Sequence, residues 1–267
     1  MKSLDRRPLG QSGIEVSRLG LGTVQLGRTE GVKYPNRFTL PDDDAVMALL
    51  ADARALGINL LDTAPAYGES ETRLGKLMGS REDWVLCTKV GEEFENGQSR
   101  FDFSGAHIRY SVERSLRRLH TDYLDIVLIH SDGNDLHILH DTDCLAMLQR
   151  LKEAGSIRAF GMSTKTIEGG LLAAQLTDVV MVTLNTQSQD DRPVIRKAAE
   201  LGRGILIKKG LSSGHLVRPA ASQEDPVFSS FELIFSEPGV DSVIVGTINP
   251  QHLRQNTEYA IRVLTAA

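Results

Sequence analysis

Four polar residues of different chemistry stand where short apolar runs of this sequence end. Each lies at or just past the last apolar residue of its run, and the four are Asp62, Tyr67, Lys89 and His130. If the runs are parallel strands of a barrel, these side chains converge on the C-terminal rim, where such barrels keep their chemistry. An acid, a phenol, an amine and an imidazole at one rim can transfer protons.

The types of these side chains indicate which reaction they can assist. A tyrosine hydroxyl, with an ordinary pKa of about 10, donates a proton poorly near neutrality. A lysine ammonium beside it lowers that pKa, and a salt bridge to an aspartate keeps the lysine charged. We therefore expect a relay from Asp62 through Lys89 to Tyr67. His130 can donate a hydrogen bond to a carbonyl oxygen. The set fits reduction of a carbonyl, in which Tyr67 protonates the oxygen while hydride reaches the carbon.

The elements that would position these residues alternate along the chain. Apolar runs predict strands at 17–22, 58–61, 84–88, 125–129, 158–162, 179–184, 204–207 and 242–245. Amphipathic stretches predict helices at 42–56, 69–78, 107–119, 141–154, 167–175, 192–201, 226–236 and 250–263. Eight such units in 267 residues favour a closed (β/α)8 barrel, preceded by a short β-hairpin around Gly10–Gly13. We expect a single domain over residues 1–267.

Composition narrows the class of protein. A net charge of −5 without a dense basic run argues against nucleic acid as a partner. The N-terminus has no signal-peptide core, and no apolar run approaches the roughly 18 residues of a membrane span, so we expect no membrane partner and a cytoplasmic location. Two cysteines make neither a disulfide framework nor a metal site, and Cys87 is interpreted as a buried small hydrophobe. We expect a monomer or weak oligomer.

One glycine-rich stretch could be mistaken for a dinucleotide-binding turn. In Gly20-Leu21-Gly22-Thr23-Val24-Gln25-Leu26-Gly27, the third glycine falls five residues after the second instead of three. No helix is predicted directly after it, as that turn requires. The stretch therefore does not indicate a Rossmann fold.

Long ordered motifs resemble the aldo-keto reductase family. They begin with Asn59-Leu60-Leu61-Asp62-Thr63-Ala64, then Tyr67-Gly68, and continue with Ile108-Arg109 and Ser111-Val112-Glu113-Arg114-Ser115-Leu116 up to Ile129-His130. Gly161-Met162-Ser163 and Val243-Ile244-Val245-Gly246 match further along, so the resemblance spans about residues 8 to 260. It implies a (β/α)8 barrel that binds NADPH (NADP+) across its rim, with Tyr67 as general acid assisted by Asp62, Lys89 and His130.

The same resemblance implies where the cofactor lies. Gly22 and Thr23 would lie near the nicotinamide, and Ser163 would bind its carboxamide. The segment from Gly246 leads into a helix whose N-terminus favours phosphate. Positions that match the family's site for the adenosine 2′-phosphate and adenine are Thr247, Asn249, His252, Gln255 and Asn256. A basic residue that is common at the position of His252 is absent, which leaves NADPH favoured over NADH but less strongly.

Two substitutions alter the part of the site that holds the nicotinamide. The family's glutamine at the sixth strand end is absent from Met181-Val182-Thr183-Leu184-Asn185, where Asn185 or Gln187 could substitute. Lys208-Lys209 replaces the aromatic that stacks on the ring, and strand alternation lets only one of these lysines, Lys208 by alignment, face the lumen. Lys208 could contact the pyrophosphate, lie near the ring, or extend to solvent.

The substrate pocket is the least defined part of the prediction. Loops beyond the strand ends carry Tyr34, Phe94 and Phe101, and such loops line the pocket in barrels of this kind. We expect an open pocket for a small-molecule carbonyl substrate, either an aldehyde or an α-dicarbonyl. Two alternatives remain open. The altered nicotinamide contacts fit a regulatory barrel that senses NADPH and turns over very slowly. A lyase or isomerase with Lys89 as a Schiff base would leave Tyr67 without a task.

Overall fold

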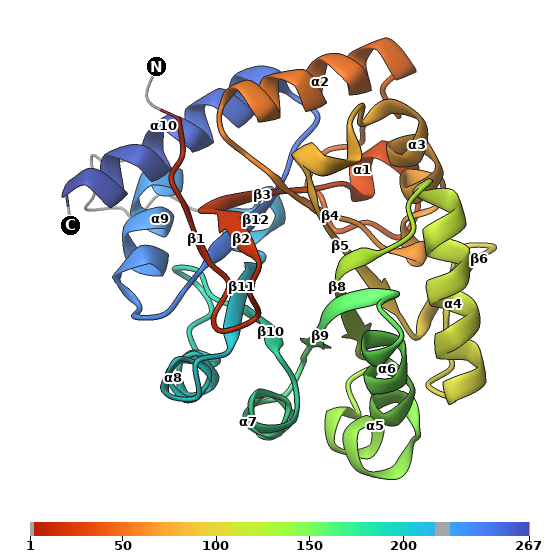
Figure 1. Cartoon of the computed structure of the whole chain (residues 1–267). Helices are drawn as coiled ribbons and strands as arrows, with labels where there is room; N and C mark the ends of the chain where they lie inside the picture. Colours follow the sequence, from red (N-terminus) through yellow and green to blue (C-terminus); the bar gives the residue numbers. More distant parts are fainter. Residues whose placement is uncertain (1–2, 217–224, 267) are drawn as a thin grey trace.

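The eight apolar runs form a closed parallel barrel in the computed structural model, which describes residues 3–216 and 225–266 (Figure 1). Neighbouring strands around the barrel follow the order β10-β11-β12-β3-β4-β5-β8-β9, and β9 pairs with β10 to close it. The strands are β3 (Leu19–Gly22), β4 (Leu60–Asp62), β5 (Val85–Val90), β8 (Leu124–His130), β9 (Ile157–Ser163), β10 (Val179–Thr183), β11 (Gly204–Lys208) and β12 (Ser242–Gly246). The predicted (β/α)8 barrel is confirmed.

Eight predicted helices surround the barrel. They are α2 (Asp43–Ala55), α3 (Ser70–Leu77), α4 (Gly105–Arg118), α6 (Cys144–Glu153), α7 (Ile167–Leu176), α8 (Arg192–Glu200), α9 (Pro226–Ser236) and α10 (Pro250–Ala266). Asp42 caps α2 because its side chain accepts a hydrogen bond from the Ala45 amide at 2.8 Å. Within the described ranges, no helix has both the length and the apolar character that a membrane span requires.

Several short elements were not predicted from the sequence. They are α1 (Val24–Gly27), α5 (Asp135–Asp141), the 3-10 turns η1 (Pro65–Tyr67), η2 (Arg81–Asp83) and η3 (Ser212–Gly214), and a hairpin of β6 (Glu92–Glu95) with β7 (Gln98–Phe101). The hairpin did have a signal in the sequence. Asn96 and Gly97 at its tip have φ values of 52° and 78°, and an Asn-Gly pair favours a turn with two positive φ angles.

A second hairpin closes the N-terminal end of the barrel. It pairs β1 (Arg6–Pro8) with β2 (Glu15–Ser17), as predicted, and it lies in front of the strands in Figure 1. Leu9, Ile14 and Val16 of this hairpin pack into the same apolar cluster as the inward side chains of the barrel strands, including Cys87. Because this end is filled with apolar side chains, polar chemistry is confined to the opposite rim.

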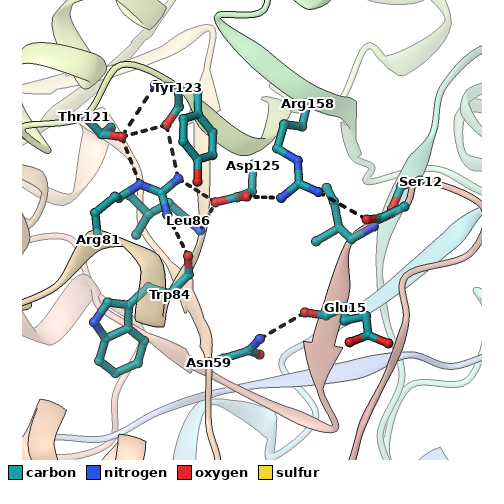
Figure 2. A network of polar contacts seen from close by, with 12 residues as sticks. Ser12, Glu15, Asn59, Arg81, Trp84, Leu86, Thr121, Tyr123, Asp125 and Arg158 are labelled. Atoms are coloured by element: carbon teal, nitrogen blue, oxygen red, sulfur yellow. Dashed lines mark hydrogen bonds and ion pairs between the residues drawn. The ribbon is translucent and has the colours of Figure 1, made fainter.

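A buried carboxylate ties this end of the barrel together (Figure 2). Asp125 accepts hydrogen bonds from Arg81 and Arg158, both at 2.7 Å, and from the Leu86 amide at 2.9 Å. Arg158 also donates to the Gly13 carbonyl at 3.1 Å, which holds the tip of the β1–β2 hairpin. Asp125 therefore joins β5, β8, β9 and the hairpin, and its role is structural.

Candidate active site

Strand alternation and parallel register bring three of the four predicted residues to one rim. Asp62, Lys89 and His130 each lie two residues after a side chain that belongs to the apolar cluster inside the barrel, namely Leu60, Cys87 and Leu128. Since side chains of a strand alternate between faces, the three polar groups point to the same interior. Their strands β4, β5 and β8 are consecutive in the barrel.

Asp62 and Lys89 form a buried ion pair. The Lys89 Nζ atom donates to Asp62 Oδ1 at 2.6 Å and to the Thr63 carbonyl at 2.9 Å, and the side chains of Lys89 and Asp62 are only 2% and 6% exposed. Burial alone would lower the pKa of Lys89, but Asp62, with smaller contributions from Tyr67 and Cys87, outweighs burial and the net pKa is raised. Lys89 is therefore held as a cation.

Tyr67 reaches the site from the turn η1, which follows β4. The turn packs so closely on α1 that a methyl group on Gly27 or Gly68 would collide with backbone atoms. Arg28 Nη1 adds a hydrogen bond to the Ala66 carbonyl at 2.8 Å. These contacts fix the turn so that the Tyr67 ring centre lies 5.0 Å from Lys89 Nζ. All four residues of the predicted set therefore meet.

The pKa of Tyr67 differs in direction from the sequence-based expectation. Burial raises it, and the charge of Lys89 at this distance lowers it only in part, so that the net pKa lies above its ordinary value. The expected lowering by Lys89 is present but is the smaller effect. Tyr67 consequently keeps its proton at neutral pH, and Lys89 would stabilise the phenolate that forms once this proton is given away.

His130 has a partner that the sequence analysis missed. Its Nδ1 atom lies 2.6 Å from Oε2 of Glu92 in β6, and the two side chains are 21% and 12% exposed. The oxygen lies off the direction of the ring N–H, so the contact is short but is not a well-aligned hydrogen bond. The His130 ring stands edge-on to Tyr67, with ring centres 6.3 Å apart. Glu92 follows Gly91, whose φ of 96° interrupts the extended backbone after β5. The alternation of side chains along β5 therefore does not predict where the Glu92 side chain points.

Lys208 faces the rim, as the alternation argument requires. Leu206, two residues earlier, belongs to the apolar cluster in the barrel, whereas Lys209 is exposed. Lys208 Nζ donates to Ser163 Oγ at 2.9 Å and to the Thr164 carbonyl at 2.6 Å. It thus binds inside the site instead of extending to solvent. Burial, followed by the nearby charge of Lys209, lowers the pKa of Lys208 to about 7.

Two neighbouring cavities lie on the β9–β11 side of the rim, and Lys208 lines the second of them. Their volumes are about 540 and 580 Å³, and both are lined by Thr183, Ser188 and Lys209. Further lysines border them, Lys33 in the first and Lys165 in the second. The proton-transfer residues, which come from β4, η1, β5 and β8, are absent from both linings, although β8 pairs with β9 and His130 is in register with Ser163. The rim therefore combines a cationic hollow with a separate proton-transfer group.

The hollow has unused hydrogen-bonding capacity that suits a phosphate-bearing cofactor. Thr164 Oγ1 and Ser212 Oγ are buried hydroxyls without a hydrogen-bond partner among the described residues. Buried polar groups normally have partners, so these two fit a bound polar ligand. Gly22 and Gly246 end adjacent strands in register, and the Tyr34 hydroxyl packs against Gly246. The residues present thus fit the nicotinamide cofactor that the sequence implies.

The remaining predicted cofactor residues fall into two groups. Thr23 and Asn185 are engaged within the protein, because Thr23 Oγ1 donates to the Asp62 carbonyl at 2.9 Å and Asn185 Nδ2 donates to the Lys209 carbonyl at 2.9 Å. The other five lie just before α10 or in its first two turns. Of these, Asn249 accepts from the Gln251 amide at 2.9 Å, Thr247 and Asn256 are buried, and His252 and Gln255 are exposed.

The three aromatic residues predicted for the substrate pocket lie in different surroundings. Tyr34 packs so closely on Gly246 that a methyl group there would meet its hydroxyl, which puts Tyr34 beside predicted cofactor residues. Phe94 lies under the Arg28 guanidinium, 3.9 Å from ring centre to Cζ. Phe101 is 37% exposed and has Lys165 Nζ 5.6 Å from its ring centre. The structure does not gather them around one pocket.

Comparison with known proteins agrees with this geometry. The family model described as "Aldo/keto reductase family" matches residues 18–230. The chain belongs to the aldo/keto reductase family. Members of this family use nicotinamide cofactors, and the chain is an NAD(P)H-dependent oxidoreductase.

Three relatives illustrate the range of similarity within the aldo/keto reductases. A crystal structure of a candidate aldo-keto reductase from Pseudomonas aeruginosa is 54% identical, covers 97% of this chain and 96% of its own, and superposes with a TM-score of 0.88. The uncharacterized oxidoreductase YqkF of Bacillus subtilis is 27% identical over 96% of this chain and 90% of its own length. The NADH-specific methylglyoxal reductase of Escherichia coli is 34% identical over 58% of this chain and 50% of its own length.

Proposed function

We propose that this aldo/keto reductase reduces small aldehydes or α-dicarbonyl compounds to alcohols with NADPH, and that Tyr67 is the general acid. The observation that carries the proposal is the buried Lys89 cation, 2.6 Å from Asp62 and 5.0 Å from the Tyr67 ring centre. The bound cofactor supplies hydride. Tyr67 gives its proton to the carbonyl oxygen, Lys89 stabilises the phenolate that results, and Asp62 keeps Lys89 charged.

The substrate class is supported from two directions. The rim is open at the two cavities beside β9–β11, which suits a small substrate next to an extended cofactor. One relative is named as a methylglyoxal reductase, and methylglyoxal is an α-dicarbonyl. That relative is named NADH-specific, whereas Lys33, Lys165 and Lys209 give the two cavities here a positive charge that suits a cofactor with more phosphate groups, such as NADPH.

Oxidation of NADPH, followed by absorbance with a panel of aldehydes, ketones and α-dicarbonyls, tests the function. We expect turnover with small aldehydes or dicarbonyls, and a lower kcat/KM when NADH replaces NADPH. Cofactor binding without oxidation across the panel would favour the second candidate, a sensor of NADPH. The observation that favours the sensor is the bond from Lys208 to Ser163, which engages the hydroxyl expected to hold the nicotinamide carboxamide.

Lys208 is expected to bind the cofactor directly, through its charge. In Lys208→Ala the dissociation constant of NADPH should rise about tenfold or more, because a hydrogen bond to a charged group is lost. Equilibrium titration of cofactor fluorescence measures this. Lys197→Ala is the control, since Lys197 lies on the outside of the barrel in α8 and pairs with Glu200. A dissociation constant of the Lys208→Ala variant within about twofold of the wild-type value would exclude this role.

A further inference from the structure

The hairpin β6–β7 places one carboxylate at the active site and another away from it. Glu92 lies 2.6 Å from His130 Nδ1, whereas the next residue, Glu93, pairs with Arg114 of α4 at 2.5 Å. The strand alternation of β6 accounts for this division. Ser99 of β7 donates to the other carboxylate oxygen of Glu92 at 2.5 Å, so Glu92 is held from two sides. The hairpin is thus anchored to α4 and presents Glu92 to the imidazole.

We propose that Glu92 is a positioning residue that holds the proton of His130 on Nδ1 and leaves Nε2 bare whenever the imidazole is neutral. A neutral imidazole carries one N–H, and the partner of one ring nitrogen decides which nitrogen keeps the proton. A carboxylate can only accept, so the nitrogen that it contacts must be the one that donates. This inference rests on the proposed function only for its consequence in turnover.

The charges around His130 decide how often the imidazole is neutral. Glu92 faces it from β6, Lys89 from β5, Lys208 from β11 and the Tyr67 phenol from η1. Burial lowers the pKa of His130, the charges of Lys89 and Lys208 lower it further, and Glu92 acts in the opposite direction; the net pKa is lowered. Burial raises the pKa of Glu92, but its contacts with His130 and Ser99 and the charge of Arg28 together outweigh burial and bring this pKa down to about 2. A carboxylate beside a neutral imidazole is therefore the resting state above neutral pH.

The consequence is a change in what His130 can do. With Nε2 bare, the ring accepts a hydrogen bond but cannot donate one to a carbonyl oxygen. Only the imidazolium form, with N–H groups on both nitrogens, adds a second donor beside Tyr67. Nε2 of His130 therefore donates a hydrogen bond at low pH and accepts one at high pH. Without Glu92, the neutral imidazole could carry its proton on Nε2, so that this nitrogen could donate at low and at high pH.

Nitrogen-15 NMR of the histidine side chains, recorded at pH 8, tests the tautomer without any turnover. The chain has seven histidines, so the His130 signals are assigned by their loss in His130→Asn. We expect a protonated Nδ1 and a bare Nε2 in the wild type, and protonated Nε2 in Glu92→Leu. A protonated Nε2 in the wild type, alone or together with Nδ1, would overturn the proposal. Glu95→Gln removes the same charge from an exposed position of β6 and should leave the signals unchanged.

The pH profile of kcat/KM at saturating NADPH tests the consequence. In the wild type, the value for reduction should fall about tenfold as the pH rises through the pKa of His130, since one hydrogen bond to the carbonyl oxygen is lost. In Glu92→Leu the fall should shrink to within about twofold, because neutral His130 can then donate from Nε2. Titration of Lys208 is common to both proteins and cancels in the comparison. An unchanged profile in the variant contradicts the proposal.

A folding defect in Glu92→Leu would not end the test. Glu92→Gln keeps the size of the side chain and removes its charge, so the NMR titration pKa of His130 must fall in that variant. An unmoved pKa would show that Glu92 does not act on His130. If no carbonyl compound is turned over, the proposed function fails, while the NMR result still decides the role of Glu92.

Discussion

Replacing Tyr67 by phenylalanine is expected to lower kcat by roughly 10²–10⁴, the range that a general acid contributes, while NADPH still binds. The substitution removes only the hydroxyl, and the turn η1 is held by other groups, among them Arg28 through the Ala66 carbonyl. The ring can therefore stay beside Lys89, 5.0 Å from Nζ to the ring centre in the wild type. Stopped-flow measurement of NADPH oxidation separates the chemical step from cofactor release.

The control for this variant is the cofactor affinity. A dissociation constant of NADPH close to that of the wild type would show that the loss is chemical. Turnover retained in Tyr67→Phe, at a rate within a few-fold of the wild type, would remove Tyr67 from the role of general acid. Because burial raises the pKa of Tyr67, the wild-type phenol itself should not limit turnover by losing its proton near neutral pH.

Removal of Asp62 is expected to have the largest effect on stability. In Asp62→Ala, Lys89 would remain 2% exposed with the Thr63 carbonyl as its remaining partner, at 2.9 Å. Breaking a buried pair on one side costs about 3–5 kcal/mol, because an uncompensated charge stays in the interior. We expect the free energy of unfolding, measured by urea denaturation, to fall by that amount.

A double variant distinguishes the loss of the ion pair from the exposure of its charge. Asp62→Leu combined with Lys89→Met replaces both charges with apolar groups of similar size, and such replacements are often neutral in stability. The double variant should therefore be more stable than Asp62→Ala, although it should lack activity. If the free energy of unfolding of Asp62→Ala falls by less than about 1 kcal/mol, the ion pair with Asp62 is not what compensates for the burial of the Lys89 charge.

Much of the fold could be read from the sequence because it depends on local patterns. Continuous apolar runs such as 179–184 and 204–207 are typical of strands buried on both faces, and each corresponds to a barrel strand. The same alternation that makes these strands places Lys208 in the lumen two residues after Leu206. Spacing along one strand is a property of the chain alone, so it needs no tertiary information.

Glu92 and Tyr34 illustrate what local patterns could not provide. Glu92 stands beyond Gly91, where the backbone turns with a φ of 96°, and its position depends on how the β6–β7 hairpin folds back over the rim. Tyr34 was expected in the substrate pocket but packs on Gly246, at the other end of the sequence. Both lie outside the barrel strands, in segments whose course is set by contacts with distant parts of the chain and not by the periodicity of their own residues.

The sequence by itself determined the barrel, its order of elements and the meeting of Asp62, Lys89 and His130, because strand ends of a parallel barrel must share a rim. Tyr67 joins them through the turn η1, which contacts with α1 and Arg28 hold in place. Only the tertiary structure decided the electrostatic state of that rim. The raised pKa of Tyr67, the lowered pKa of Lys208 and the pairing of His130 with Glu92 all arise from burial and from charges on other elements. Desolvation depends on everything packed around a group, so no motif or spacing encodes it.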